Sequence, residues 1–181
     1  VPKPLVEAGG KPLITWHLEA LARAGFREVV VNISHLSGQV KNTLGDGSNW
    51  GLSIRYSVEK PEALETGGGI FKALPMLGNG PFLVINSDIW TDYPLGRLRA
   101  VKCDHAHIVL VPRPNHSNGD FALVSGRVMN SGEPLHTYAG ITVYHPRMFR
   151  DYQPGRFSAV PLLQKAIDEH LVTGELHRSR W

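Results

Sequence analysis

Pro81-Phe82-Leu83-Val84-Ile85-Asn86-Ser87-Asp88 is the stretch of sequence that decides the fold. The uninterrupted apolar run from Phe82 to Ile85 predicts a strand buried on both faces, as in a parallel sheet. Ligands of such sheets bind just beyond the carboxyl ends of the strands. Asp88 falls at this point, so we expect its carboxylate where water, a metal ion or a substrate can reach it. A turn-forming Asp after a core strand is the alternative interpretation.

Strands and helices are predicted to alternate through the first half of the chain. The helices are expected at 12–23, 36–44 and 66–74, and the strands at 28–33, 51–56 and 82–85. This order is typical of a parallel sheet with helices on both faces. The second half is more mixed, with strands expected at 107–111, 120–124 and 137–144 and helices at 146–150 and 159–170. We find no repeat or linker, so one domain covering 1–181 is expected.

The composition is that of a globular protein and argues against two classes of partner. The formal charge of +3 suits anionic substrates, but the charge is not clustered as in a nucleic-acid binder. No apolar run approaches the roughly 20 residues that span a membrane. Cys103 is the single cysteine, which excludes an internal disulfide and fits a reducing compartment, the cytoplasm. We expect a structural role for its thiol.

Glu62-Ala63-Leu64-Glu65-Thr66-Gly67-Gly68-Gly69-Ile70 is a second informative stretch. Three glycines at a helix N-terminus leave backbone N–H groups free and let a flat ligand approach closely. Thr66 is expected to be the N-cap, and Glu62 supplies an acceptor upstream. A glycine N–H and a carboxylate match the ring carbonyl and ring N–H of a pyrimidine such as uracil. A flexible loop that caps an ordinary helix is the alternative.

Lys3 is the third candidate. It lies between Pro2 and Pro4, which predict a stiff, extended segment. A lysine held in this way is a point charge suited to phosphate. A solvated surface lysine is the alternative interpretation.

Four motifs follow one another along the chain at suitable separations: Pro2-Lys3-Pro4-Leu5-Val6, Lys11-Pro12-Leu13-Ile14, Leu64-Glu65-Thr66-Gly67-Gly68-Gly69 and Asn86-Ser87-Asp88. As a set, they resemble those of the sugar-1-phosphate nucleotidyltransferases. Residues 65–74, Trp90-Thr91-Asp92 and Gly119-Asp120-Phe121 favour the uridylyltransferase branch of bacterial cell-wall recycling. The mannose-1-phosphate guanylyltransferases are near neighbours.

The resemblance implies both a fold and a reaction. The fold is a Rossmann-like three-layer α/β/α nucleotidyltransferase domain of the GT-A-like type, with a mostly parallel central sheet. The reaction joins UTP and a sugar-1-phosphate, with N-acetylmuramic acid 1-phosphate as the best candidate, into a UDP-sugar and pyrophosphate. The sugar phosphate oxygen attacks the α-phosphorus in line, and Mg²⁺ is the expected cofactor.

The resemblance also implies residue roles. Lys3 contacts phosphate, and Asp88 holds Mg²⁺; both are expected to be catalytic. The remaining candidates are Glu62, Thr66, Gly67 and Gly68 for the nucleotide, and Asn86, Asp120 and Gly140 for the sugar.

The chain departs from the family at three places. Ser87 stands where the family usually has glycine before the metal-binding aspartate. The family's first strand, with its glycine-rich loop, would precede Val1, and its second metal-binding aspartate would follow Trp181. We therefore expect these 181 residues to be part of a longer chain.

Two other functions remain open at this point. A dinucleotide-binding oxidoreductase would use Gly67-Gly68-Gly69 for phosphate and Asp88 for a ribose hydroxyl. Lys72 at the third glycine position, and the lack of a strand before the glycines, argue against it. A non-catalytic nucleotide-sugar-binding subunit on the same fold is the second alternative.

Several further residues have competing interpretations. His105 and His107 could pair on a metal, although ordinary strand residues are favoured because no third ligand is evident. His116 and Asp120 could form a ligand pair across a loop, although a turn is favoured. Asp92 is interpreted as a helix cap before residues 95–101. Trp90 and Tyr93 are expected to line the pocket or close the core.

Overall fold

A computed structural model of the chain describes residues 2–34, 36–60, 62–115 and 118–181. These residues form two compact units. The first contains the residues up to Gly78 together with Pro94–Gly96 and Gln153–Ala159. The second contains Asn79–Tyr93, Arg97–Tyr152 and Val160–Trp181. Each unit has a sheet of its own.

The first unit is built around two parallel strands, β3 (Glu28–Ile33) and β4 (Ser53–Val58). Its helices are α1 (Leu13–Arg23), α2 (Ser37–Leu44) and α3 (Glu65–Leu77), and α3 packs against both strands. The 3₁₀ helices η1 (Lys3–Leu5) and η2 (Ser48–Trp50) and the short antiparallel strands β1 (Glu7–Ala8) and β2 (Lys11–Pro12) complete it.

Apolar periodicity explains the core of the first unit. Ile14 and Leu18 are four residues apart on α1, so they lie on one face of the helix, and both are buried. They pack with alternate residues of the two strands and with α2 in one cluster, whose other members are Val31, Ile33, Val40, Leu44, Leu52 and Ile54. The predicted elements of this half are confirmed to within three residues at each end. The largest difference is in α3, which continues through Pro75 and ends three residues later than predicted.

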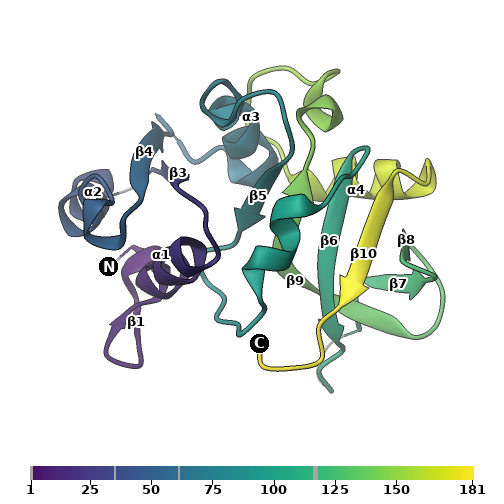
Figure 1. The fold of residues 1–181 in the computed structure, drawn as a ribbon. Helices are drawn as coiled ribbons and strands as arrows, with labels where there is room; N and C mark the ends of the chain where they lie inside the picture. The colour runs from purple at the N-terminus through teal and green to yellow at the C-terminus, as the bar shows by residue number, and fades with distance from the viewer. Residues whose placement is uncertain (1, 35, 61, 116–117) are drawn as a thin grey trace. The chain divides into compact units, whose positions relative to one another are not determined.

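The second unit contains a six-stranded sheet in the order β5-β9-β6-β10-β8-β7. Figure 1 shows β9, β6 and β10 side by side. The strands are β5 (Phe82–Ile85), β6 (Ala106–Pro112), β7 (Phe121–Val124), β8 (Arg127–Met129), β9 (Leu135–Tyr144) and β10 (Val172–Leu176). The helices are η3 (Leu95–Ala100), η4 (Pro146–Phe149) and α4 (Ala159–Asp168), of which η3 and α4 begin in the first unit. Sequence reasoning missed β8, which is only three residues long.

The sheet of the second unit is mixed, and not mostly parallel as predicted. Only β6 and β10 pair in parallel, and the other pairings in this sheet are antiparallel. Because β9 also pairs with β7, the strands β9, β6, β10, β8 and β7 form a closed series of pairings. The predicted α/β class is confirmed. In this half, some successive strands are connected by hairpins and others by helices.

The strand β5 has the predicted bounds but not the predicted environment. In the described residues it pairs only with β9, and the pairing is antiparallel. Phe82 is buried, whereas Leu83 to Ile85 are partly exposed, because β5 lies at an edge of this sheet. The strands buried on both faces are β6, where Ile108, Val109 and Leu110 are all fully buried, and the centre of β9. None of the described helices is both long and apolar enough to cross a membrane.

The glycines at the start of α3 allow another segment to pack closely against the helix. Gly67, Gly68 and Gly69 are all buried. A Cβ atom on Gly68 would collide with the carbonyl oxygen of Gly155, and one on Gly67 would meet the ring of Phe157. Packing within the first unit therefore requires glycine, which has no Cβ atom, at these positions.

Phe157 also completes the backbone hydrogen bonds of this first turn. Its carbonyl oxygen accepts from the N–H of Gly68 at 3.0 Å, and its own N–H donates to the carbonyl oxygen of Leu64 at 3.1 Å. In an ideal α-helix, those two groups of Leu64 and Gly68 would bind each other. Residue 64 is the N-cap and has no side-chain cap bond, and Thr66 lies inside the helix, so the predicted Thr66 cap is wrong.

We expect Gly68→Ala to destabilise the protein by about 1–3 kcal/mol, because its methyl group must displace the Gly155 backbone. For a chain of this size, this lowers the thermal midpoint by several degrees, as measured by circular dichroism. Gly38→Ala is the matched control, since Gly38 lies in α2 and, among the described residues, no atom beyond its chain neighbours and its own helix backbone lies within 4 Å of the added methyl group. That change is expected to leave stability equal or to raise it by about 0.5–1 kcal/mol. Equal midpoints for the two variants would contradict this account.

The surroundings of Cys103 fit the structural role expected for the single cysteine of the chain. Its thiol lies 3.7 Å from the carbonyl oxygen of Val143. Burial, together with the nearby Asp104 carboxylate, raises the pKa of Cys103 to about 11. The thiolate, which is the reactive form, is therefore scarce near neutral pH.

We predict that the native protein reacts about a hundredfold more slowly with a disulfide reagent at about pH 8 than the denatured protein does. The sequence has one cysteine, so the colour change reports Cys103 alone. The rate in the native protein should rise until the pH passes about 11. Equal rates before and after denaturation would show that the thiol is not shielded.

Candidate functional site

Asp88 lies three residues beyond the carboxyl end of β5, as the sequence predicted, and its side chain is exposed. Within the part of the chain that the structure describes, no group hydrogen-bonds or forms an ion pair with its carboxylate. Both oxygens are therefore available to a ligand from solution. We therefore place the candidate site of the second unit at the end of β5 and in the turn that follows it.

Asn86 and Gly140 are brought into direct contact. The pairing of β5 with β9 places Ile85 opposite Ile141, and just beyond it the N–H of Asn86 donates to the carbonyl oxygen of Gly140 at 2.9 Å. Gly140 is buried and has a φ of +77°, which favours glycine. A Cβ atom there would lie 3.0 Å from Nδ2 of Asn86. The fit between these two predicted sugar-side residues therefore requires the glycine.

Gly140 sits in a bulge of β9. Ile108 and Leu110 are two residues apart on β6, whereas their partners on β9, Thr142 and Tyr138, are four residues apart. The bulge, residues 139–141, therefore carries two more residues than the strand beside it. Bulges occur preferentially next to binding sites, because they turn backbone groups out of the regular ladder.

Asp120 holds the strand at the edge of this bulge. Its Oδ2 accepts from the N–H of Tyr138 at 2.8 Å, and its own N–H donates to the carbonyl oxygen of His136 at 2.7 Å. Its side chain is otherwise exposed. The structure therefore brings the three predicted sugar-side residues, Asn86, Asp120 and Gly140, to one short stretch of β9.

Trp181 contacts the same stretch and was missed by sequence reasoning. Its indole Nε1–H donates to the carbonyl oxygen of Ala139 at 2.8 Å. This contact joins residues 42 positions apart. No local pattern could have revealed it, because neither residue carries a motif of its own.

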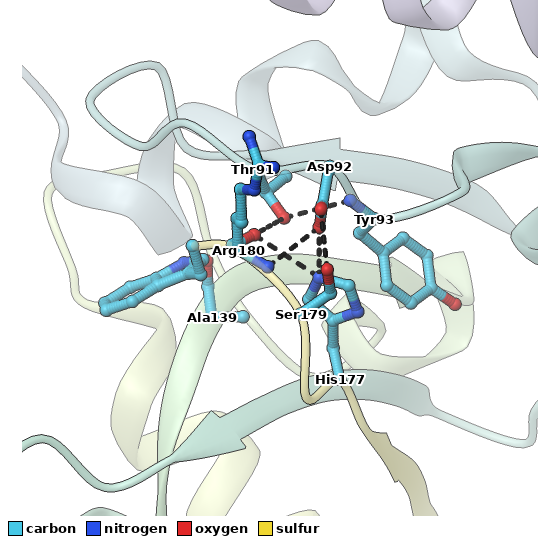
Figure 2. A network of polar contacts seen from close by, with 8 residues as sticks. Thr91, Asp92, Tyr93, Ala139, His177, Ser179 and Arg180 are labelled. Atoms are coloured by element: carbon cyan, nitrogen blue, oxygen red, sulfur yellow. Dashed lines mark hydrogen bonds and ion pairs between the residues drawn. The ribbon is translucent and has the colours of Figure 1, made fainter.

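Asp92 binds the C-terminal segment of the chain, and the predicted role as a helix cap is wrong. Its carboxylate accepts from Nε2 of His177 at 2.8 Å, from Oγ of Ser179 at 2.6 Å and from the N–H of Arg180 at 3.0 Å (Figure 2). These hydrogen bonds, that of Ser179 foremost, lower the pKa of Asp92. The carboxylate thus accepts hydrogen bonds from donors 85 or more residues away in the sequence, and not from the helix that follows it.

Of the two neighbouring aromatic residues, Tyr93 is buried and packs edge to face against His177, whereas Trp90 is exposed. Of the two predicted roles, closing the core or lining a pocket, the core role is confirmed for Tyr93.

Lys3 begins the 3₁₀ helix η1 in the first unit, where an extended segment was predicted. The ring of each flanking proline fixes its own φ at a value that suits a helix as well as an extended segment, which explains the difference. Its side chain is exposed, and no described group hydrogen-bonds or pairs with its ammonium group. The charge is therefore available to an anion.

The nucleotide candidates also lie in the first unit, and their arrangement differs from the expected one. Glu62 is exposed, and its carboxylate lies 3.9 Å from Arg156, which also pairs with Glu65 at 2.9 Å. Thr66 is exposed, and the backbone N–H of Gly68 is already bound by Phe157. The prediction of a free N–H group at Gly68 is therefore wrong for this conformation.

Glu59 is a polar residue that the sequence analysis overlooked. It follows β4 directly, is buried, and its Oε2 accepts from the N–H of Leu64 at 2.7 Å. A Cβ atom on Gly69 would press against its other oxygen. A carboxylate placed directly after a strand was the available signal, as it was for Asp88.

Of the two histidines considered as a metal pair, His107 lies in β6, whereas His105 lies in the bend just before that strand, so the prediction that both are strand residues holds for His107 alone. Nδ1 of His107 lies 2.8 Å from Oγ1 of Thr173, and burial lowers the pKa of His107. Among the described residues, no three or more His, Cys, Asp and Glu side chains group around a possible metal position. The proposed pairing of His116 with Asp120 lies outside the described residues.

Comparisons with known proteins show the family to which the chain belongs. Residues 1–127 match the family model described as nucleotidyl transferase. The chain is 40% identical to an N-acetylmuramate alpha-1-phosphate uridylyltransferase of Neisseria meningitidis serogroup B, over 99% of this chain and 82% of that protein. It is 32% identical to the enzyme of the same name from Caulobacter vibrioides, over 99% of this chain and 81% of the relative.

The fold has a close counterpart among solved structures. The inositol-1-phosphate CTP transferase from T. maritima superimposes with a TM-score of 0.78 over 99% of this chain and 78% of the other, at 16% sequence identity. This likeness supports the nucleotidyltransferase fold. From the family model and from the two relatives matched along almost the whole chain, we conclude that this chain belongs to the sugar-1-phosphate nucleotidyltransferases.

Proposed function

We propose that this protein transfers the uridylyl group of UTP to N-acetylmuramic acid 1-phosphate. An oxygen of the sugar phosphate forms a bond to the α-phosphorus of UTP, and the bond from that phosphorus to the β-phosphate oxygen breaks. The products are the UDP-sugar and pyrophosphate. The observation that carries the proposal is the 40% identity, over 99% of this chain, to an enzyme named for this reaction.

The proposed chemistry brings two anions together, so positioning and electrostatic stabilisation dominate it. Lys3 supports this role with an exposed charge that no described group neutralises. Asn86, Asp120 and Gly140 would hold the sugar, because they meet on the bulged stretch of β9. Glu62, Thr66, Gly67 and Gly68 remain the proposed nucleotide residues, with the N–H of Gly68 released from Phe157 where it contacts the base.

Asp88 has the donor chemistry that Mg²⁺ needs. Mg²⁺ is usually held by one or two carboxylates, with phosphate oxygens and water as its other ligands. The exposed carboxylate of Asp88, without a described partner, fits this pattern as one protein ligand. When bound, the ion would neutralise charge on the phosphates. Asp88 itself would fix where that positive charge lies relative to the end of β5.

We expect Asp88→Asn to lower kcat on the order of a hundredfold at saturating Mg²⁺, because an amide is a weaker ligand and carries no charge. Pyrophosphate release measures this rate directly. Asp104→Asn is the matched control, since Asp104 is an exposed carboxylate of the same unit whose ion pair with Arg147 is long, at 3.9 Å. The control should retain activity within about twofold. Similar activity for both variants would remove Asp88 from the metal site.

The substrate pair can be identified by measuring pyrophosphate release from the full-length protein with a matrix of substrates. UTP, GTP, CTP and dTTP are each combined with the 1-phosphates of N-acetylmuramic acid, mannose and glucose. We expect kcat/KM for UTP with N-acetylmuramic acid 1-phosphate to exceed every other pair by at least about tenfold. Preference for GTP and mannose 1-phosphate would instead identify a guanylyltransferase, and the proposed substrates would be wrong.

The biological setting follows from the proposed substrates. A uridylyltransferase for this sugar phosphate would serve the recycling of cell-wall peptidoglycan. The cytoplasmic location that the single cysteine suggests stays a prediction.

A further inference from the structure

The C-terminal residues His177–Trp181, here called the strap, are held mainly by polar contacts. Residues 178–181 are exposed, so little apolar burial fixes their position. Segments with few buried contacts open at low free-energy cost unless hydrogen bonds hold them. Hydrogen bonds therefore hold the strap in place.

Asp92 is the principal acceptor for the strap. It receives hydrogen bonds from His177, Ser179 and the backbone N–H of Arg180, as described above (Figure 2). Hydrogen bonds to an ionised carboxylate are roughly twice as strong as neutral ones. The lowered pKa of Asp92 agrees with such an ionised acceptor.

The turn around Asp92 binds the strap in the other direction as well. The carbonyl oxygen of Arg180 accepts from Oγ1 of Thr91 at 3.1 Å and from the N–H of Asp92 at 3.3 Å. The ring of Tyr93 packs edge to face on that of His177, with centroids 5.3 Å apart. The N–H of His177 donates to the carbonyl oxygen of Leu110 at 2.8 Å, which ties the start of the strap to β6.

The strap leads to the bulge of β9. Its last residue, Trp181, donates its indole N–H to the carbonyl oxygen of Ala139 at 2.8 Å. The next residue, Gly140, meets Asn86 through its own carbonyl oxygen. The bulge is thus held from one side by the strand that leads to Asp88, and from another by a strap that Asp92 secures.

We propose that Asp92 is a positioning residue for the sugar phosphate, which it serves without touching it. By holding the strap, Asp92 keeps Trp181 on Ala139 and so fixes the backbone of the bulge at Gly140. The inference rests on the proposed function, because it assigns the bulge to the sugar side of the same site. It predicts that loosening the strap affects binding of the sugar phosphate and spares binding of the nucleotide.

Asp92→Asn tests the proposal in the full-length protein. The amide keeps the shape of the side chain but loses the charge and presents a donor toward the donors of the strap. We expect KM for the sugar phosphate to rise about tenfold, with kcat and the KM for UTP within about threefold of the parent. Ser179→Ala removes one of the three side-chain and backbone donors, so its effect should have the same direction and be smaller.

A spectroscopic signature separates positioning from general loss of structure. With 5-fluorotryptophan in place of tryptophan, the ¹⁹F resonance of Trp181 is assigned by its disappearance in Trp181→Phe. In Asp92→Asn, this resonance should move toward the solvent-exposed position, while those of Trp16 and Trp50, which belong to the first unit, stay unchanged. Asp104→Asn, the same chemical change outside the strap, should leave both the spectrum and the kinetics as in the parent. If Asp92→Asn fails to fold, Ser179→Ala carries the test.

Three results would overturn the proposal. The Trp181 resonance could stay in place in Asp92→Asn, it could move without any rise in the KM for the sugar phosphate, or both KM values could rise equally. Failure of the proposed function is a different result: the parent then releases no pyrophosphate with any sugar phosphate. In that case, the Trp181 resonance still reports whether Asp92 holds the strap.

Discussion

The antiparallel pairing of β5 with β9 is the constraint on which the candidate site depends. It sets the register that places Ile85 opposite Ile141, and this register brings Asn86 against Gly140. This bond continues the register of β5 and β9 by one residue, at the place where β9 bulges relative to β6. A shift of register by one residue would turn every side chain of β5 to the opposite face. The pairing therefore places the chain that leads to Asp88 beside the bulged stretch of β9.

The glycines of α3 show that one sequence feature can satisfy two demands. The absence of Cβ atoms predicts a surface that a flat ligand can approach. In this structure, the backbone of residues 155–157 occupies that position, and Phe157 binds the N–H of Gly68. The same absence of side chains permits both arrangements, because each needs a backbone or a ring within contact distance of the helix. The glycine pattern alone thus identifies a place of close approach and not its occupant.

In each unit, a carboxylate that comes after a strand holds a segment from elsewhere in the chain. Glu59 follows β4 and holds the N–H of Leu64, and Asp92 follows β5 and holds the strap. Asp88 also follows β5, and it differs from the other two because no described group binds its carboxylate. This difference separates a carboxylate that organises the fold from one that is available to a metal ion. It could not be inferred from residue type, because all three are carboxylates that come after a strand.

The sequence by itself determined the elements of the first half, the position of Asp88 beyond β5, and the family. These follow from local information: apolar periodicity, glycine and proline punctuation, and motifs whose order does not depend on contacts. Only the tertiary structure decided the mixed sheet, the bulge at Gly140, the packing of Phe157 on α3, and the binding of the strap by Asp92. Each of these joins residues far apart in the chain. Their partners are chosen by which donor and acceptor groups remain unsatisfied after the strands have paired, and no stretch of sequence records that outcome.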